Sequence, residues 1–318
     1  MAEEERMAEE GRMVDDGPAA AAGTITIGGG LTVNRLGFGA MRVTGRGVWG
    51  PPADRGEAFR VLRRAVELGV QFIDTADSYG PDVSEELIAQ ALSPYPAGVV
   101  IATKGGYLRD GPDQWRPDGR PDHLRAACEG SLRRLDLEQI PLYQLHVPDP
   151  AVPFDESVGA LVELRDEGKI AHIGLSNVEV DQVRSAAALT PVASVQNRYN
   201  TGDRRSDPVV ELAGELGFAF IPWAPVGGGR PGQGRALEVV AHRRGVTPVQ
   251  VAIAWQLARS PRMLPIPGTG TVAHLEQNVA AGGVDLTEQD LADLARPPRP
   301  RVSPRRLAGR LRRRYLSG

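Results

Sequence analysis

Apolar, strand-like runs alternate with helix-like segments along most of this chain, and several of these runs end in a polar residue. The runs VQFID, GVVIATK and PLYQLH are followed by or end in Asp74, Lys104 and His146, and Tyr79 lies just after the first of them. Such alternation predicts a parallel sheet covered by helices. Eight strand–helix pairs can be counted, which favours a closed α/β barrel, the (β/α)8 TIM barrel, over an open sheet.

Individual elements follow from the same pattern. The segment TITIGGGLTV predicts an N-terminal β-hairpin, LGFGAM the first barrel strand and MLPIP the eighth. Asp54 and Ser84 are suited to cap two helices. The helices are expected at 54–68, from Ser84, from near Asp122, and at 154–167, 179–187, 208–216, 235–244, 248–258 and 271–280, with 287–295 as an extra terminal helix.

The two ends of the chain differ from its middle. Residues 1–23 are expected to form an acidic, disordered tail, residues 24–295 a single barrel domain, and residues 296–318 a flexible arginine-rich tail without any acidic residue. Solvated tails are one interpretation of such charge runs. The alternative is a basic amphipathic helix at the C-terminus, because Leu307, Leu311 and Tyr315 recur every four residues; it would dock on an acidic surface or a polyanion.

Composition argues against several classes of protein. With 318 residues, 41% of them hydrophobic, the chain is long enough for one large core, and its net charge of −3 gives no bias toward nucleic acid or membrane partners. No apolar run approaches the roughly 20 residues of a membrane span. The single cysteine, Cys128, cannot form an internal disulfide, so a cytoplasmic location is expected. Monomer and homo-oligomer both remain open.

Tyr79, Lys104, Asp74 and His146 are the candidate catalytic residues. A phenol is a weak acid at neutral pH, and a nearby ammonium favours its ionised form; Lys104 would have this role and Asp74 would neutralise and orient Lys104. His146 would hydrogen-bond and orient a substrate carbonyl. Taken singly, each residue has a structural interpretation, such as a helix cap, a surface aromatic, a solvated strand end or a core imidazole. Four suitable types after separate strands favour an oxidoreductase that needs no metal and takes its electrons from an organic cofactor.

The segments FIDTADSYG, IATKGG, YQLH, HIGLSN, VQNRYN and IPGTGTVAHLEQN, in this order, resemble the aldo-keto reductase superfamily over residues 30–295. The resemblance implies a barrel that binds NADPH, with Tyr79 as proton donor, Lys104 and Asp74 as its partners, His146 as the orienting residue, and direct hydride transfer to an aldehyde or ketone. It places the cofactor contacts at Gly39, Met41, Asp74, Ser176, Asn177, Gln196, Trp223, Ala224, Pro225, Gly227, Gly268, Thr269, Gly270, His274, Gln277 and Asn278.

Within these cofactor contacts, the resemblance assigns Ser176, Asn177 and Gln196 to the nicotinamide carboxamide and Trp223 to stacking on its ring. Gly268 and Thr269 are expected to open a helix whose free N–H groups bind the adenosine-side phosphate. Many relatives have a lysine and an arginine, which bind the 2′-phosphate, at the positions of Gly268 and His274. This chain lacks both, so NADH is an alternative to NADPH, which the resemblance still favours as the cofactor. The GxGxxG match at 227–232 lacks an acid about 20 residues on and is interpreted as a lid loop over the pyrophosphate.

Substrate preference is expected from the loops after the first and third strands. The candidate pocket residues are Trp49, Tyr79, Tyr107, Trp115 and His146. The segments GRGVWGPPADR, DTADSYGP and IPGTGTVAHL look most similar to bacterial pyridoxal-reductase-like members. This resemblance implies a small-molecule carbonyl substrate, an aromatic aldehyde such as pyridoxal, that is reduced to an alcohol. The alternatives are a pathway-specific carbonyl reductase of secondary metabolism and a non-catalytic NADP(H)-sensing regulatory subunit.

Overall fold

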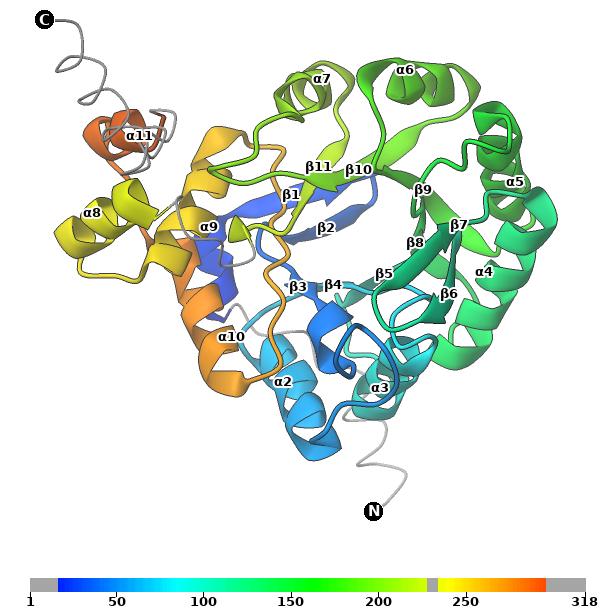
Figure 1. The fold of residues 1–318 in the computed structure, drawn as a ribbon, viewed down its shortest axis with the longest axis horizontal. Coiled ribbons are helices and arrows are strands. Elements are labelled where there is room, and N and C mark those ends of the chain that lie inside the picture. The colour runs from blue at the N-terminus through cyan, green and yellow to red at the C-terminus, as the bar shows by residue number, and fades with distance from the viewer. Residues whose placement is uncertain (1–16, 228–233, 296–318) are drawn as a thin grey trace, which may run out of the picture.

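A curled parallel sheet surrounded by helices forms the body of the protein (Figure 1). The computed structural model describes residues 17–227 and 234–295. Within them a sheet of seven strands runs in the order β11-β10-β9-β8-β5-β4-β3 with every neighbouring pair parallel. Its strands are β3 (Phe38–Gly39), β4 (Phe72–Asp74), β5 (Val100–Gly105), β8 (Ile140–Leu145), β9 (Ile170–Ser176), β10 (Val192–Arg198) and β11 (Ala219–Trp223).

The eighth predicted strand closes the barrel without being a regular strand. The N–H of Phe220 donates to the Arg262 carbonyl at 2.8 Å, and Leu264 donates back to Phe220 at 2.9 Å. On the other side, Gly37 of the segment before β3 donates to Pro265 at 2.9 Å. Pro265 and Pro267 have no N–H to give, so the ladder stays incomplete. The segment nevertheless joins β11 to β3, and the predicted (β/α)8 barrel is confirmed.

Helices cover the outside of the sheet in chain order (Figure 1). They are α2 (Arg55–Glu67), α3 (Val83–Leu92), α4 (Pro121–Leu135), α5 (Phe154–Asp166), α6 (Val180–Leu189), α7 (Asp207–Leu216), α8 (Gly234–Arg244), α9 (Pro248–Arg259), α10 (Val272–Val279) and α11 (Glu288–Ala295), with the short 3-10 helices η1 (Pro18–Ala22), η2 (Ala40–Val43) and η4 (Ala280–Gly283). Asp54 caps α2 as predicted, accepting the Glu57 N–H at 2.8 Å; such a cap contributes about 1 kcal/mol.

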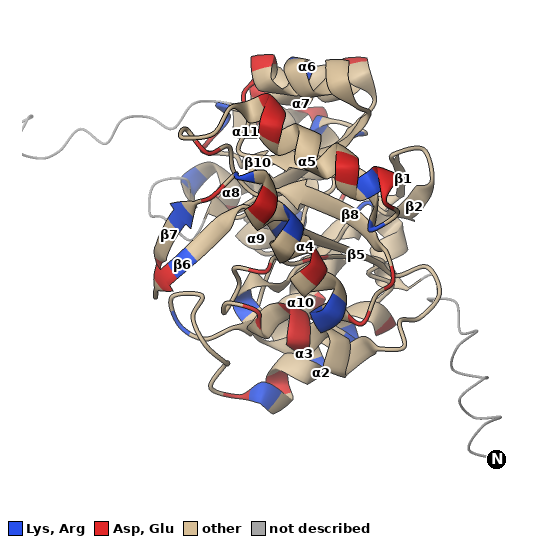
Figure 2. Cartoon of the chain, turned by 90° about the vertical axis from the view of Figure 1, so that its right-hand side faces the viewer, with Lys and Arg blue, Asp and Glu red and all other residues tan. Residues whose placement is uncertain are grey.

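The predicted N-terminal hairpin is present and covers the end of the barrel at which the parallel strands begin. Its strands β1 (Thr24–Ile27) and β2 (Leu31–Asn34) pair antiparallel. Ile25, Ile27 and Val33 are buried in one apolar cluster with barrel residues, among them Phe72 and Leu142. In Figure 2 this hairpin lies at the right, and the second hairpin, β6 (Tyr107–Gly111) and β7 (Gln114–Pro117), at the left. The two hairpins therefore mark opposite ends of the barrel.

Three details differ from the sequence-based expectations. The segment Pro18–Ala22 belongs to the fold and not to the acidic tail: Ala19 is fully buried and donates to Leu68 at 3.0 Å, because alanine is small enough for the helical turn to pack against η4. Ser84 does not cap α3; it lies inside the helix, fully buried, and its hydroxyl donates to Ala40. The segment after β5, expected as a long loop, forms the β6–β7 hairpin.

The remaining predictions for the chain ends, the acidic segment before residue 17 and the arginine-rich segment 296–318, lie outside the described residues, as does most of the predicted lid loop at 227–232. In Figure 2, acidic and basic residues are interspersed over the outer helices. No helix in the described part of the chain is both long and apolar enough to cross a membrane.

Candidate active site

Asp74, Lys104 and His146 lie at the carboxyl ends of three adjacent strands. Asp74 ends β4, Lys104 lies next to the end of β5, and His146 follows β8. Because these strands are parallel neighbours, their ends meet at the same edge of the barrel. Tyr79 reaches this edge from the turn between β4 and α3, where its N–H donates to Ala76. The structure thus brings the four predicted residues Asp74, Tyr79, Lys104 and His146 together; they are called the tetrad below.

Lys104 and Asp74 form a buried ion pair. The Lys104 Nζ donates to Asp74 Oδ1 at 2.6 Å, to the Thr75 carbonyl at 2.7 Å and to Tyr79 Oη at 3.5 Å. The Lys104 side chain is 0% exposed and that of Asp74 2%. Gln144 and Gln196 donate to the second oxygen, Asp74 Oδ2, at 3.1 and 2.8 Å. With these partners both charges are satisfied without water, as a buried pair requires.

Burial and the ion pair act in opposite directions on the pKa values of this group. Burial alone would lower the pKa of Lys104, but the charge of Asp74 opposes it and the net direction is upward; the ammonium form is retained. Burial raises the pKa of Tyr79, and Lys104 lowers it by less. Lys104 therefore acts in the expected direction without bringing the phenol below its ordinary pKa. At neutral pH Tyr79 carries its proton next to a cation that would stabilise the phenolate.

His146 is held neutral beside Tyr79. Burial, followed by the charges of Lys104 and Arg109, puts the pKa of His146 well below its ordinary value. Its ring lies 5.8 Å from that of Tyr79, centroid to centroid. The Ser78 hydroxyl lies 3.3 Å from Nδ1; if Ser78 donates there, Nε2 carries the hydrogen and can donate to a substrate oxygen.

Aromatic side chains form one wall of the site. The Tyr107 ring lies 4.7 Å from that of His146, and the Trp115 ring lies 6.3 Å from both Tyr79 and His146, all in edge-on arrangements. Trp49 is 37% exposed and lies farther out, beside Gly80. The predicted pocket residues therefore share one region, with Tyr107 and Trp115 from the β6–β7 hairpin nearest to the tetrad.

One group of predicted cofactor residues adjoins the tetrad. Asn177 follows β9 and donates to the His146 carbonyl at 2.9 Å and to Ser176 Oγ at 3.1 Å. Its side-chain oxygen accepts the indole N–H of Trp223, at the end of β11, at 3.0 Å. The partly exposed indole of Trp223 is thereby fixed in orientation, as an aromatic group that stacks on a planar ring must be. Ala224, Pro225 and Gly227 follow Trp223 directly, and Ala224 has a positive φ of 51°.

A second group lies where the barrel closes. A Cβ on Gly39 would come within 2.8 Å of the Ile266 carbonyl oxygen, and one on Gly268 would overlap the carbonyl oxygen of Gly39 itself. A Cβ on Gly270 would lie 3.1 Å from the Arg42 carbonyl. Met41 packs beside Tyr79 and Val48. The close approach of the Gly268 and Gly39 backbones therefore leaves no room for a side chain at position 268.

The helix that follows agrees with the range expected at 271–280, but Gly268 and Thr269 do not open it. Gly268 and Thr269 precede α10, which begins at Val272 after the cap residue Thr271. One N–H of its first turn is already used, because Val272 donates to Glu57 Oε1 at 3.0 Å. His274 and Gln277 are exposed and Asn278 is buried. Within the described chain no hydrogen bond joins these residues to Asp74, Tyr79, Lys104 or His146, and their assignment to the cofactor stays a prediction.

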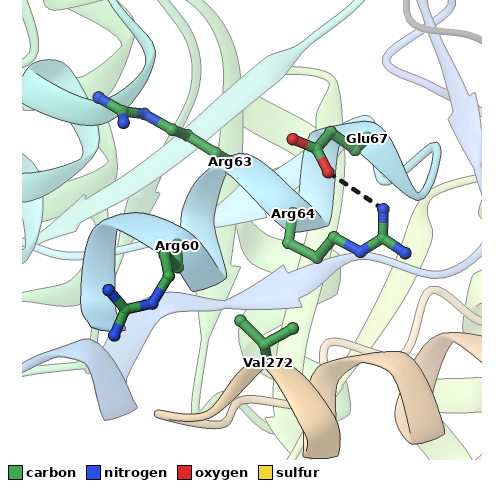
Figure 3. Close-up of a pocket in the computed structure, with 5 residues that line it drawn as sticks. All are labelled: Arg60, Arg63, Arg64, Glu67 and Val272. Carbon is green, nitrogen blue, oxygen red and sulfur yellow. Dashed lines mark hydrogen bonds and ion pairs between the residues drawn. The ribbon is translucent and has the colours of Figure 1, made fainter. Parts of the chain in front are cut away.

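A cavity of about 260 Å³ lies apart from the tetrad, between α2 and the start of α10. Figure 3 shows its lining residues, Arg60, Arg63, Arg64, Glu67 and Val272. Arg64 pairs with Glu67 at 3.0 Å and Glu276 at 2.9 Å, and Arg60 with Glu57 at 2.8 Å. Arg60 and Arg64 are thus engaged in surface ion pairs, and the cavity contains none of Asp74, Tyr79, Lys104 and His146.

Sequence reasoning missed several residues that complete the site. Gln144 donates to Asp74, Ser78 contacts His146, and Arg109 supports the aromatic wall. For Gln144 a signal existed: it lies on β8 two residues before His146, which directly follows the strand. In an extended chain, residues two apart point to the same side. For Arg109 there was none, because its partners are backbone carbonyls, three of them in distant segments of the chain.

The chain belongs to the aldo/keto reductase family, whose members are NAD(P)H-dependent oxidoreductases. The family model matches residues 35–231 and 233–296, which span the barrel and the tetrad.

Individual relatives agree with this membership. The chain is 47% identical over 267 residues to an uncharacterized oxidoreductase of Schizosaccharomyces pombe, covering 84% of this chain and 87% of the relative. It is 43% identical over 269 residues to pyridoxine 4-dehydrogenase of Escherichia coli, covering 83% and 94%. Among solved structures it resembles glycerol dehydrogenase from Gluconobacter oxydans, with TM-score 0.79, 26% identity and coverage of 88% and 98%. An aldo/keto reductase from Klebsiella pneumoniae, solved with NADP and acetate, matches with TM-score 0.72, 27% identity and coverage of 87% and 96%.

Proposed function

We propose that this protein reduces an aldehyde or ketone to an alcohol with NADPH, with Tyr79 as the proton donor. The observation that carries the proposal is the Tyr79 hydroxyl 3.5 Å from the Lys104 ammonium, in a site where Tyr79 retains its proton and His146 is neutral. When bound, the reduced nicotinamide supplies a hydride to the carbonyl carbon. The carbonyl π bond opens toward oxygen, and that oxygen takes the Tyr79 proton.

The residues around the tetrad suit a nicotinamide. Trp223 offers an indole fixed by Asn177, and Ser176 and Asn177 supply the polar atoms that a carboxamide requires. Gln196 donates one amide N–H to Asp74, and its carbonyl oxygen can accept a hydrogen bond from the carboxamide. Lys104 remains next to the phenolate that forms when Tyr79 gives up its proton, and His146 orients the carbonyl oxygen.

We propose a planar aromatic aldehyde of the pyridoxal type as substrate. Two findings support this: the Tyr107–Trp115 wall beside His146 and the 43% identity to the Escherichia coli pyridoxine 4-dehydrogenase. NADPH is preferred over NADH in this proposal because solved relatives contain NADP or NADPH. The buried thiol of Cys128 fits a reducing cytoplasm.

The test is steady-state consumption of NADPH, and separately NADH, with pyridoxal and a panel of aliphatic and aromatic carbonyls. Tyr79→Phe should reduce turnover by about 10²- to 10⁴-fold, the contribution of a positioned general acid, and leave NADPH affinity within about threefold, since the hydroxyl is not a cofactor contact. The matched control is Tyr95→Phe, which removes a phenol bonded to the Leu135 carbonyl at 2.6 Å, away from the tetrad.

The outcomes separate the alternatives. Turnover confined to one unusual ketone would favour the pathway-specific carbonyl reductase. Tight NADPH binding without turnover on any carbonyl would refute catalysis and favour the regulatory, NADP(H)-sensing protein.

A further inference from the structure

Arg109 on β6 places its guanidinium group behind the aromatic wall of the site. Each of its N–H groups is matched by a backbone carbonyl: Nε donates to Gln114 at 3.0 Å, and the two terminal nitrogens donate to four further carbonyls. Those bonds reach Val48 at 2.8 Å, Ser78 at 2.7 Å, Gly47 at 2.9 Å and Gly111 at 3.2 Å. A guanidinium has five N–H donors in a rigid plane, and here all five are engaged.

These carbonyls come from separate parts of the chain. Gly47 and Val48 lie in the loop before α2, Ser78 lies in the turn that carries Tyr79, and Gly111 and Gln114 belong to the β6–β7 hairpin. Arg109 therefore joins three segments of the chain, one of which is the turn that carries Tyr79. No carboxylate takes part in these bonds, so the contacts fix backbone positions.

The face of the same guanidinium supports Trp115. The Arg109 Cζ lies 3.7 Å from the centroid of the Trp115 ring and 5.7 Å from that of Trp49. Stacking of this kind is a property of the planar guanidinium that an ammonium does not share. Trp115 is thus supported from behind, and its ring lies edge-on to Tyr79 and His146.

We propose that Arg109 is the positioning residue that sets substrate specificity: by fixing Trp115 against the tetrad it selects flat, aromatic carbonyl compounds. This inference rests on the proposed carbonyl reduction. Because all five donors are engaged, Arg109 does not bind the substrate itself, and selection acts through the shape of the wall.

Arg109→Lys tests the proposal, since it keeps the charge but loses the planar fork and the stacking face. For an aromatic aldehyde such as benzaldehyde, kcat/KM should fall by about 10- to 100-fold, the range expected when a substrate is misplaced by roughly 1 Å. For propanal, which is too small to need the wall, the change should stay within about threefold. NADPH affinity should remain that of the wild type.

The control is Arg116→Lys on the neighbouring strand β7. Arg116 is 56% exposed and pairs with Asp110 at 3.3 Å, so the ratio of kcat/KM for benzaldehyde to kcat/KM for propanal should stay unchanged. Trp115→Ala leaves the five hydrogen bonds from Arg109 to backbone carbonyls intact. It should nevertheless lower the ratio of kcat/KM for benzaldehyde to kcat/KM for propanal. Combining it with Arg109→Lys should add little further loss, because both changes remove one interaction. Equal losses on both aldehydes, or additive effects of the two changes, would overturn the proposal.

A measurement without substrate separates this inference from the proposed function. Acrylamide quenching of tryptophan fluorescence should increase in Arg109→Lys, and the increase should be smaller in a Trp115→Phe background, where only Trp49 still lies near the guanidinium. Absence of wild-type turnover with every carbonyl would refute the reductase function. Unchanged quenching together with an unchanged aldehyde ratio would refute the role of Arg109.

Discussion

The Nζ atom of Lys104 lies 2.6 Å from Oδ1 of Asp74, and neither side chain has appreciable contact with solvent. The pair is joined to the reacting phenol on one side and to Gln144 and Gln196 on the other. The ion pair is therefore both a structural element of the barrel end and the electrostatic neighbour of Tyr79.

Lys104→Met should separate these two roles. It leaves the Asp74 carboxylate buried without its cation, which is expected to cost about 3 to 5 kcal/mol of unfolding free energy. Adding Asp74→Asn should recover most of this stability, because the uncompensated charge is gone, but carbonyl reduction should stay lost. Urea unfolding and NADPH consumption measure the two effects; recovery of turnover in the double variant would contradict the role given to Lys104.

The pH profile of carbonyl reduction should be flat across the neutral range. Burial lowers the pKa of His146 well below 6.5 and raises that of Tyr79 above 10.0, so neither group changes its proton between these values. Because the pKa of His146 is lower in the folded than in the unfolded state, His146 also affects the free energy of unfolding. Its stabilising contribution is present above pH 6.5 and is lost as the pH falls towards the folded-state pKa. An acid limb of kcat/KM near pH 6.5 would show that His146 titrates as an exposed imidazole.

The fold was predictable because the alternation of strand-like and helix-like segments is visible locally in the sequence. The site was predictable because the fold decides where the ends of the strands lie. Parallel strands bring their carboxyl ends together, so Asp74, Lys104 and His146 could be placed at one edge from strand ends alone. Arg109 could not, since its acceptors are carbonyls up to 62 residues away in the chain and any residue supplies a carbonyl. Ser84 was misplaced for a similar reason: a serine that caps a helix and one that bonds a distant Ala40 carbonyl look alike in sequence.

Cofactor preference can be tested at the two positions where many relatives carry basic residues. Gly268→Lys should not improve NADPH binding and should destabilise the fold, because a Cβ there would overlap the Gly39 carbonyl. His274→Arg on the exposed face of α10 meets no such obstacle. It should raise the NADPH-to-NADH affinity ratio by about tenfold, the effect of one charge-assisted contact of roughly 1.4 kcal/mol. Fluorescence titration with both nucleotides measures this; an unchanged ratio would place the 2′-phosphate away from position 274.

Asp77 offers a test of what burial costs near the site. Its Oδ1 is buried without a hydrogen-bond partner in the described structure, and burial together with the charge of Glu85 raises its pKa well above 3.8. A carboxyl whose pKa is raised on folding stabilises the fold below its unfolded pKa, and this contribution is lost as the pH rises through the folded pKa. Asp77→Asn should therefore increase the unfolding free energy at pH 8 by about 1 to 3 kcal/mol, the cost of an unsatisfied buried group.

The gain from Asp77→Asn should shrink as the pH falls, because a protonated Asp77 resembles asparagine. Urea unfolding at pH 5 and pH 8 measures the difference, and Asp110→Asn on the exposed face of β6 is the control, since its side chain is 52% exposed. A gain of equal size at both pH values would show that the charge of the Asp77 carboxylate is not the cause of the destabilisation.

Glu85 should not behave in this way. Thr103 and Arg134 donate to its two oxygens, so Glu85→Gln removes a partner from Arg134 and should destabilise the fold at either pH.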